Sequence, residues 1–600
     1  MKHHRIEAPM ASTVVEVAVA PGQAVARGAL LLVVEAMKME HEIRAEADAV
    51  VVQVSAVAGE VVEAGDLLVQ LGPPGAAAAP SPTRAAGATA PAGLRADLQE
   101  LHTRTAFTQD EHRPEAVARR HAAGQRTARE NVADLCDPDS FVEYGALAIA
   151  AQRSRRSLEE LIAATPADGM VTGIGRVNGA RCVVMAYDAT VLAGTQGLRN
   201  HQKTDRLLGI AHDEGLPVVL FAEGGGGRPG DVDLPIVAGL HVPTFASFAR
   251  LSGRVPVVGI ASGRCFAGNA ALLGCSDVII ATANSNIGMG GPAMVEGGGL
   301  GACRPEDIGP SEVQSANGVI DLLVPDEAAA VAAAKQYLGY FQGRTDGGLG
   351  ADPALLREAL PANRVRSYDM RAVIALIADA GSVLELRRGF GIGIHTALVR
   401  IAGQPVGLLA NNPNHLGGAI DADAADKAAR FIALCNTHGL PIVSLIDTPG
   451  FMVGPQTETR AQVRHVSRMF VAAAHLRVPY LALVLRKGYG LGAMAMAAGG
   501  FHAPLMTAAW PSGEFGAMGL EGAVRLGYRR ELEALPEGAA REQRYRELLA
   551  QQVEAGKAIN MAATLEIDAV IDPAQTRAWL AAGLASGQVR PREAGGLDPW

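Results

Sequence analysis

The sequence predicts a multi-domain chain in which a small all-β domain, a flattened β-barrel or sandwich, precedes two repeated α/β domains. Three observations predict this architecture. Residues 1–72 contain a short repeat of alternating apolar residues. Residues 73–93 are rich in alanine and proline. The remainder of the chain contains a second and much longer repeat.

The short repeat recurs 37 positions along the chain. The matching residues are Val15, Val17, Gly22, Val25 and Gly28 in the first copy, and Val52, Val54, Gly59, Val62 and Gly65 in the second. Each copy alternates apolar residues around glycine-containing turns, a pattern typical of short strands in two sheets packed face to face. We therefore expect residues 1–72 to form one domain, with Lys38 in the tight segment between the copies.

The alanine- and proline-rich stretch at 73–93 has almost no large apolar side chain to bury. Such a composition predicts a flexible and fairly extended tether. At the polyproline rise of about 3.1 Å per residue, roughly 20 residues reach some 60 Å if stiff. A domain on this tether could visit separate sites.

The long repeat recurs after 224 or 223 positions. Residues 215–219, Gly-Leu-Pro-Val-Val, return as Gly-Leu-Pro-Ile-Val at 439–443, and Arg-Val-Pro at 254–256 returns at 477–479. Each copy mixes β-branched runs with amphipathic segments, which predicts layers of helices on a sheet. We expect two α/β domains, at 94–345 and 346–600.

Composition excludes several classes of protein. The 600 residues carry a net charge of -9 with a pI near 6.0, so the chain lacks the basic surface that nucleic-acid binding requires. The chain has only six cysteines and no C-x-x-C pair, which indicates reduced thiols. The sequence shows neither an apolar signal core at its start nor an uninterrupted apolar stretch of membrane-spanning length. We expect a cytoplasmic protein with no nucleic-acid or membrane partner.

Lys38 stands between the two copies of the short repeat, flanked by Met37 and Met39. A lysine at a hairpin tip is usually only a solvated charge. Here two hydrophobic halves would present the amine rigidly on an exposed turn, where a modifying enzyme can reach it. Residues 36–39, Ala-Met-Lys-Met, resemble the attachment motif of biotinyl domains, and the resemblance covers residues 1–72.

The resemblance implies biotin bound covalently to Lys38, with Met37 and Met39 as apolar shoulders of the cofactor attachment site. A biotin protein ligase is the implied partner that modifies the amine. Lipoyl carriers share the fold but typically have an aspartate before the lysine, where this chain has Met37. Biotin is therefore the favoured cofactor.

Two glycine-rich turns stand where a predicted strand leads into a predicted helix. Residues 263–271 follow the apolar run 255–261, and residues 489–494 follow the run 480–485. Free backbone amides on such turns can stabilise an oxyanion. The glycines could instead serve only close helix packing. Because the turns fall at equivalent positions of the repeat, we favour a functional role.

These turns, the duplicated α/β unit and Asp-Thr-Pro-Gly-Phe at 447–451 together resemble the acyl-CoA carboxyltransferase family, whose two halves are crotonase-like domains. The resemblance covers roughly residues 94–590. It implies that the amides of Gly268 and Asn269 hold the thioester oxygen of an acyl-CoA. Asn269 is a departure, since a second glycine is common there.

In the second half, the resemblance places the ureido oxygen of biotin on the amides of Gly492 and Ala493. Leu491 reads as an extra residue in the usual Tyr-Gly-Gly-Ala run, so the choice of Gly492 over Gly490 rests on the 224-residue offset. The four catalytic residues expected from the sequence are thus Gly268, Asn269, Gly492 and Ala493.

The implied reaction is carboxyl transfer from carboxybiotin on Lys38 to the α-carbon of an acyl-CoA, without a side-chain base. The alternatives are a component of a biotin-dependent acyl-CoA decarboxylase or transcarboxylase, and a non-catalytic biotin carrier scaffold. The expected partners are a separate biotin carboxylase subunit and further copies of this chain, as a dimer or hexamer. Each site would combine the N half of one subunit with the C half of another.

Ala495 is the candidate wall of the acyl pocket. In the resembled family an aspartate at this position accompanies acetyl and propionyl substrates. Losing that carboxylate should favour an aliphatic tail, by about 0.8 kcal/mol for each methylene newly buried. We expect butyryl-CoA or longer thioesters to be used at least as well as acetyl-CoA.

Other tempting residues lack the spacing that a site requires. His201 and His415 have no second histidine or cysteine at metal-ligand spacing, so no metal is expected. The run Gly224–Gly227 lacks the Gly-Lys-Ser/Thr ending of a phosphate loop, and we expect it to shape a cleft.

Overall fold

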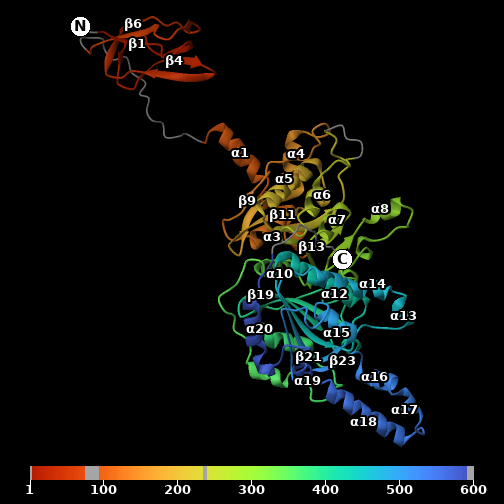
Figure 1. The fold of residues 1–600 in the computed structure, drawn as a ribbon. Helices are drawn as coiled ribbons and strands as arrows, with labels where there is room; N and C mark the ends of the chain where they lie inside the picture. The colour runs from red at the N-terminus through yellow and green to blue at the C-terminus, as the bar shows by residue number, and fades with distance from the viewer. Residues whose placement is uncertain (1–2, 75–93, 234–238, 591–596, 598–600) are drawn as a thin grey trace. The chain divides into compact units, whose positions relative to one another are not determined.

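The computed structural model describes residues 3–74, 94–233, 239–590 and 597 (Figure 1). The chain divides into two compact units, Met1–Gln99 and Glu100–Trp600, and each is described by itself. From residue 75 to residue 93 the predicted tether lies outside the described residues.

The first unit is an all-β sandwich of two four-stranded sheets. One sheet has the order β1-β8-β6-β3 and the other has the order β5-β4-β2-β7. Their strands are β1 (His4–Glu7), β2 (Ser12–Val17), β3 (Ala24–Val25), β4 (Leu30–Ala36), β5 (Met39–Arg44), β6 (Ala49–Val54), β7 (Val61–Val62) and β8 (Leu67–Gly72). Repeat-related strands occupy matching places in the two sheets. The core holds Val14 and Val51, and likewise Leu31 and Leu68, all fully or almost fully buried. The prediction of a small all-β domain is confirmed.

The second unit contains two similar mixed sheets. The N-half sheet has the order β9-β10-β11-β12-β13-β14-β16, with β15 paired to β13. The first two pairings are antiparallel and the rest are parallel. Its strands are β9 (Val142–Glu143), β10 (Met170–Val177), β11 (Ala180–Tyr187), β12 (Val218–Gly225), β13 (Val257–Phe266), β14 (Val278–Thr282), β15 (Asn286–Gly288) and β16 (Leu322–Val324).

The C-half sheet repeats this order as β17-β18-β19-β20-β21-β22-β24, with β23 paired to β21. Its strands are β17 (Leu384–Leu386), β18 (Ile394–Ile401), β19 (Gln404–Asn411), β20 (Ile442–Thr448), β21 (Tyr480–Tyr489), β22 (Met506–Ala509), β23 (Glu514–Gly516) and β24 (Ala569–Val570). The prediction of two repeated α/β domains is confirmed.

Helices cover both faces of each sheet. In the N half, α5 (Leu198–Glu214), α6 (Thr244–Ala249) and α7 (Gly268–Gly274) lie on one face, and α3 (Ala128–Leu135) and α10 (Glu327–Gly339) on the other. In the C half, α12 (Ala422–His438), α14 (Gln462–Ala474) and α15 (Gly490–Met496) face α11 (Met370–Ile377) and α20 (Thr576–Ser586) across the sheet. The other α-helices are α1 (Ala96–Ala106), α2 (Pro114–Ala122), α4 (Leu158–Ala164), α8 (Pro292–Gly297), α9 (Ser311–Ala316), α13 (Pro455–Glu458), α16 (Leu520–Gly527), α17 (Arg529–Glu533), α18 (Ala539–Ala555) and α19 (Ala558–Ala563).

The two halves share one hydrophobic core. Helices α3 and α10 of the N half pack in the same cluster as α12, α14 and α15 of the C half, and Figure 1 shows α10 and α12 between the two sheets. Buried polar contacts cross this interface. Arg387 pairs with Asp321 at 2.9 Å, and His438 Nε2 lies 2.8 Å from Asp277 Oδ2. The halves therefore form one body.

Each half buries a lysine at the same repeat position. Lys203 in α5 donates to the carbonyls of Ala167 and Met170, and Lys427 in α12 donates to the carbonyl of Phe390 at 3.0 Å. Both ammonium groups hold the turn that precedes the first long strand of their half. Burial lowers the pKa of Lys203 to about 8 and that of Lys427 to about 7.

The lowered pKa of Lys427 predicts a pH-dependent stability. Between pH 7 and the unfolded value near 10.5, the unfolded state binds more protons than the folded state, so the folded state gains stability as the pH rises. Lys427→Met removes this dependence, which amounts to at most about 5 kcal/mol. The melting temperature of the wild type, measured by calorimetry, should rise relative to that of Lys427→Met between pH 7 and pH 10. Lys335→Met, at a partly exposed lysine, is the control, and a gap that does not vary with pH would contradict the assignment.

Candidate active site

Lys38 lies at the tip of the β4–β5 hairpin. Ala36 and Met39 form the last pair of the ladder, which leaves Met37 and Lys38 as a two-residue loop. Both loop residues have positive φ, 53° and 65°, as a type I′ turn requires. That turn normally takes Asn-Gly, so Met-Lys adopts it at a cost in backbone strain. The ladder thus holds the lysine in an exposed and fixed turn.

The side chains around Lys38 leave the amine open. Met37 is 99% exposed and Met39 is 65% exposed, whereas Ala36 and Val34 below them are buried. Exposed methionines on a rigid tip give an apolar surface that a modifying enzyme or a second domain can contact. The structure therefore brings Met37, Lys38 and Met39 together as the sequence predicts.

The N-half turn joins β13 to α7. Ala267 has a φ of 52°, and its amide donates to the carbonyl of Gly288 in β15 at 3.0 Å. The amides of Gly268 and Asn269 follow at the first helical positions, which have no acceptor within a helix. A side chain at Gly268 would collide with Oε1 of Gln196. The turn therefore presents two backbone donors in a crowded setting.

The C-half turn joins β21 to α15 in the same way. Gly490 has a φ of 56°. An added Cβ at Gly492 would lie 2.7 Å from Cα of Gly450, so only glycine fits this backbone crossing. Ala493 and Ala495 follow in α15, and both are fully buried.

The ladder of each half fixes which residues of the two turns are equivalent. Phe266 pairs with Gly288 in the N half, and Tyr489 pairs with Gly516 in the C half. Phe266 therefore matches Tyr489, an offset of 223 residues, and Ala267 matches Gly490, both with positive φ. In this frame Gly268 matches Leu491, and Asn269 matches Gly492. Leu491 is no insertion, and the 224-residue frame of the sequence is displaced by one residue here.

A carboxylate lies at the end of the strand beside each turn. Asp447 in β20 is fully buried and pairs with Arg486 at 3.0 Å, and it accepts the amide of Lys487 at 3.2 Å. The Lys487 ammonium donates to the carbonyl of Gly417 at 2.5 Å, and burial lowers its pKa. Three charged groups thus lie together near the end of β20 and in β21, just before the C-half turn.

Glu223 occupies the matching position in the N half, 224 residues before Asp447. Arg120 of α2 (Pro114–Ala122) binds both carboxylate oxygens of Glu223, at 2.5 and 2.8 Å. Burial raises the pKa of Glu223 to about 7, against the lowering effect of Arg120. No local motif singles out Glu223 in the sequence, although the long repeat aligns it with Asp447.

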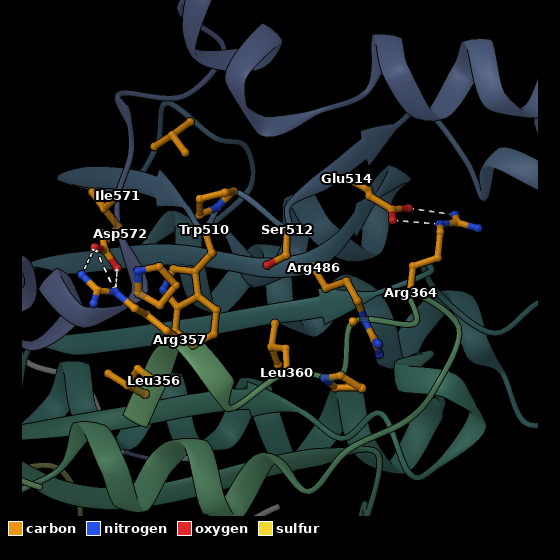
Figure 2. A pocket seen from close by; sticks show the side chains of 15 residues that line it. Leu356, Arg357, Leu360, Arg364, Arg486, Trp510, Ser512, Glu514, Ile571 and Asp572 are labelled. Atoms are coloured by element: carbon orange, nitrogen blue, oxygen red, sulfur yellow. Dashed lines mark hydrogen bonds and ion pairs between the residues drawn. The ribbon is translucent and has the colours of Figure 1, made fainter. Parts of the chain in front are cut away.

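A cavity lies at an equivalent place in each half, near the carboxyl ends of the parallel strands, where α/β sheets commonly bind ligands. The N-half cavity, of about 450 Å³, is lined by Ala193, Glu223, Gly224 and Asn286 among others. The C-half cavity, of about 750 Å³, is lined by Arg486, Trp510, Ser512 and Glu514 among others. Figure 2 shows Arg364 paired with Glu514, and Arg357 paired with Asp572, at its rim.

Three other residues singled out from the sequence have structural partners. His201 Nδ1 lies 2.8 Å from Thr244 Oγ1, and His415 Nε2 lies 3.3 Å from Asp421 Oδ2. Ala495 packs within the core shared by the two halves. Ala495 lines neither of the two cavities described above, so its part in an acyl pocket stays a prediction.

Comparison with known proteins identifies the family of each unit. A family model described as "Carboxyl transferase domain" matches residues 119–594, and one described as "Biotin-requiring enzyme" matches residues 4–71. The chain belongs to the carboxyl transferase family. It is a biotin-dependent carboxyltransferase with a biotin carrier domain in the same chain.

Two relatives illustrate the range of this family. The methylmalonyl-CoA carboxyltransferase 12S subunit of Propionibacterium freudenreichii is 33% identical over 502 residues, which cover 80% of this chain and 93% of that protein. A solved structure described as a single-chain, multi-domain long-chain acyl-CoA carboxylase is 56% identical, with a TM-score of 0.79. That match covers 97% of this carboxyltransferase but only 56% of the longer chain. Within the described residues, the carboxyltransferase has no helix long and apolar enough to cross a membrane.

The crossing of Gly492 over Gly450 predicts a sharp mutational effect. Gly492→Ala must push the first turn of α15 away from Gly450, because the new methyl group would lie 2.7 Å from its Cα. A displacement of about 1 Å at a catalytic group costs roughly 100-fold in rate. We expect carboxyl transfer to fall by about that factor.

Gly500→Ala is the matched control for this prediction. Gly500 lies four residues after the end of that helix, and an added Cβ there meets no atom within 4 Å. It should keep wild-type turnover in the same steady-state assay. Equal turnover of Gly492→Ala and Gly500→Ala would show that the crossing is irrelevant to the chemistry.

Proposed function

We propose that this carboxyltransferase moves a carboxyl group from biotin on Lys38 to the α-carbon of an acyl-CoA with four or more acyl carbons. The observation that carries the proposal is the pair of strand-to-helix turns at equivalent positions of the two halves. Each turn presents backbone amides without helical acceptors. The reaction develops negative charge on two oxygens, and two sets of preorganised hydrogen-bond donors can stabilise these charges.

The N-half amides of Gly268 and Asn269 are our proposed donors to the thioester oxygen. In the C half we propose the amides of Leu491 and Gly492, which match them in the strand register. The sequence suggested Gly492 and Ala493. Ala493 corresponds instead to Ala270, the next position of the helix. Removing one such donor typically costs roughly 100- to 1,000-fold in turnover.

The carrier domain fits covalent biotin through its exposed hairpin tip. Biotin, when bound, supplies the carboxyl group and a ureido oxygen that takes up charge as that group leaves. We propose Lys38 as the attachment residue because the ladder fixes its turn and leaves the amine open. Met37 and Met39 would flank the attached cofactor.

We propose that the active assembly contains at least two copies of the chain. Helix α7 packs with α5 and α6 on the face of the N-half sheet that points away from the C half, whereas α15 packs in the core between the halves. The two turns of one chain therefore lie in different layers, and a second copy can bring an N-half turn opposite a C-half turn. The transcarboxylase 12S structure, 31% identical with a TM-score of 0.72, is described as a hexamer assembly.

Two further partners belong to this proposal. A biotin protein ligase attaches biotin to Lys38. A biotin carboxylase outside these 600 residues carboxylates it, and the 56% identical structure is described as a multi-domain carboxylase.

The acyl chain length is proposed from two observations. The structure described as a long-chain acyl-CoA carboxylase shares 56% identity with this chain. The resemblance placed the aspartate position of enzymes for short acyl chains at Ala495 by reading Leu491 as an insertion; without the insertion that position falls on Met494, and both residues are apolar. Each extra methylene buried from water contributes about 0.8 kcal/mol. A longer tail should therefore bind more tightly, provided that it finds an apolar wall.

Lys38 should be the single biotinylated residue. Lys38→Arg keeps the positive charge but removes the nucleophilic amine, so the variant should carry no biotin when expressed with the ligase. Intact mass and streptavidin blotting measure this directly. Biotin detected on Lys38→Arg would overturn the assignment. Met39→Leu is the control and should still be labelled, because the amine and its turn remain.

Substrate preference should favour butyryl-CoA or longer over acetyl-CoA. The measurement is kcat/KM for acyl-CoAs of two, three, four, eight and sixteen carbons, with the biotinylated chain and a biotin carboxylase. Ala495→Asp would bury a carboxylate in the core and destabilise the fold. Ala495→Val therefore tests the wall that the sequence suggested, and Met494→Asp tests the position that the strand register assigns, with melting temperatures as the control. A steep fall beyond propionyl-CoA in the wild type would refute the proposed chain length.

A further inference from the structure

Asn269 differs from its counterpart in the C half. It stands in the first turn of α7, where α15 has Gly492, and its side chain is fully buried. Its Nδ2 donates to the carbonyl of Gly194 at 3.1 Å and to the carbonyl of Glu223 at 2.7 Å. One carboxamide therefore joins the helix, the loop after β11 and the end of β12.

The neighbours of Asn269 fix the orientation of its amide. Both groups that it contacts are backbone carbonyls, which accept hydrogen bonds and cannot donate them. Oδ1 of Asn269 is buried and has no hydrogen-bond partner among the described residues. Leaving a buried acceptor unpaired costs stability, so this arrangement persists because the two donated bonds hold it.

The segments that Asn269 joins lie very close together. Gly194 has a φ of +65°, and an added Cβ there would lie 2.7 Å from the carbonyl oxygen of Glu223. A second side-chain amide lies against the turn between β13 and α7. The side chain of Gln196 fills the space beside Gly268 and donates to Tyr187 Oη at 3.0 Å. Two side-chain amides thus brace the N-half turn.

The C half reaches the same backbone geometry without these side chains. Gly492 replaces Asn269 and packs directly on Gly450, and Ile420 replaces Gln196, as the matching bridges Gln196–Gly227 and Ile420–Phe451 show. The C-half turn is therefore held by backbone contact, and the N-half turn by hydrogen bonds. A turn held by a side chain can be loosened by changing that side chain alone.

We infer that Asn269 is a positioning residue, whose carboxamide holds the amides of Gly268 and Asn269 in place for the thioester oxygen of the acyl-CoA. The inference rests on the proposed function and deepens it, because it separates the side-chain role of Asn269 from its backbone role. The donors to an oxyanion contribute only when their positions are set before the reaction. The loss should therefore fall on kcat more than on KM.

The experiment compares Asn269→Ala, Asn269→Ser and Asn269→Asp in the biotinylated chain with its biotin carboxylase. Asn269→Ala should lower kcat roughly 10- to 100-fold with KM changed less than about threefold, since small misplacements at a reacting centre cost about this much. Asn269→Ser keeps one donor and should fall in between. Asn269→Asp places a carboxylate against two carbonyls, so it should be the least active at pH 8 and recover in part as the pH falls and the acid becomes a donor.

Asn436→Ala is the matched control. Asn436 also uses its amide as a brace, donating to the carbonyl of His475 at 2.9 Å and accepting the amide of Arg477 at 2.8 Å, at the opposite end of the C-half sheet. It should keep wild-type kcat. Hydrogen exchange gives a readout without turnover, and the amides of residues 268–271 should exchange at least tenfold faster in Asn269→Ala than in the control.

Each outcome decides one question. Wild-type kcat in Asn269→Ala, or an equal loss in Asn436→Ala, would refute the positioning role. Unchanged exchange at 268–271 would refute the brace itself. A wild-type chain that carboxylates no acyl-CoA would refute the proposed function, and the exchange measurement would still report on the brace.

Discussion

The tight packing around two strand-to-helix turns is the constraint on which this carboxyltransferase depends. At Gly492 the chain passes so near Gly450 that any side chain would collide, and in the N half Asn269 ties the turn to Gly194 and Glu223, whose backbones are equally close to each other. Backbone amides can act as donors only if the peptide units are held rigidly and close to the reacting oxygen. The parallel strands beneath each turn provide that rigidity.

The two halves have kept one geometry and changed what supports it. An acidic residue ends the matching strand in both halves, but Glu223 is bound by Arg120 of α2 and Asp447 by Arg486 of its own sheet. The first turn of the following helix is braced by a carboxamide in the N half and by glycine packing in the C half. Such differences suit halves that bind different molecules while presenting the same pair of donors.

In the carrier domain, strand pairing alone sets the conformation of the turn that carries Lys38. Ladder pairs on both sides of the β4–β5 loop force Met37 and Lys38 into positive φ, a conformation that side chains of this size adopt at a cost. The well-packed apolar core of the sandwich supplies the stability that offsets this strain. The backbone at Lys38 is therefore held in one turn, and its exposed side chain projects from that turn.

The sequence alone determined the architecture and the family. Repeats of 37 and about 224 residues keep the apolar periodicity of their strands, and that periodicity is local, so it survives in the order of residues. The same local information placed Lys38 on a turn, and Gly268 and Gly492 at strand-to-helix junctions. Biotin and the carboxyl transferase family followed from these motifs, and the comparisons confirm both.

Only the tertiary structure decided how the two turns correspond and what holds them. Leu491 reads as an insertion in the sequence, but the pairs Phe266–Gly288 and Tyr489–Gly516 show that it occupies the position of Gly268. Ala495, which looks like a pocket residue along the chain, is buried in the core between the halves. The bond from Asn269 to Glu223 and the pairing of Arg120 with Glu223 span 46 and 103 residues, respectively. Contacts of this kind depend on how sheets and helices stack in space, and no local pattern of residues encodes them.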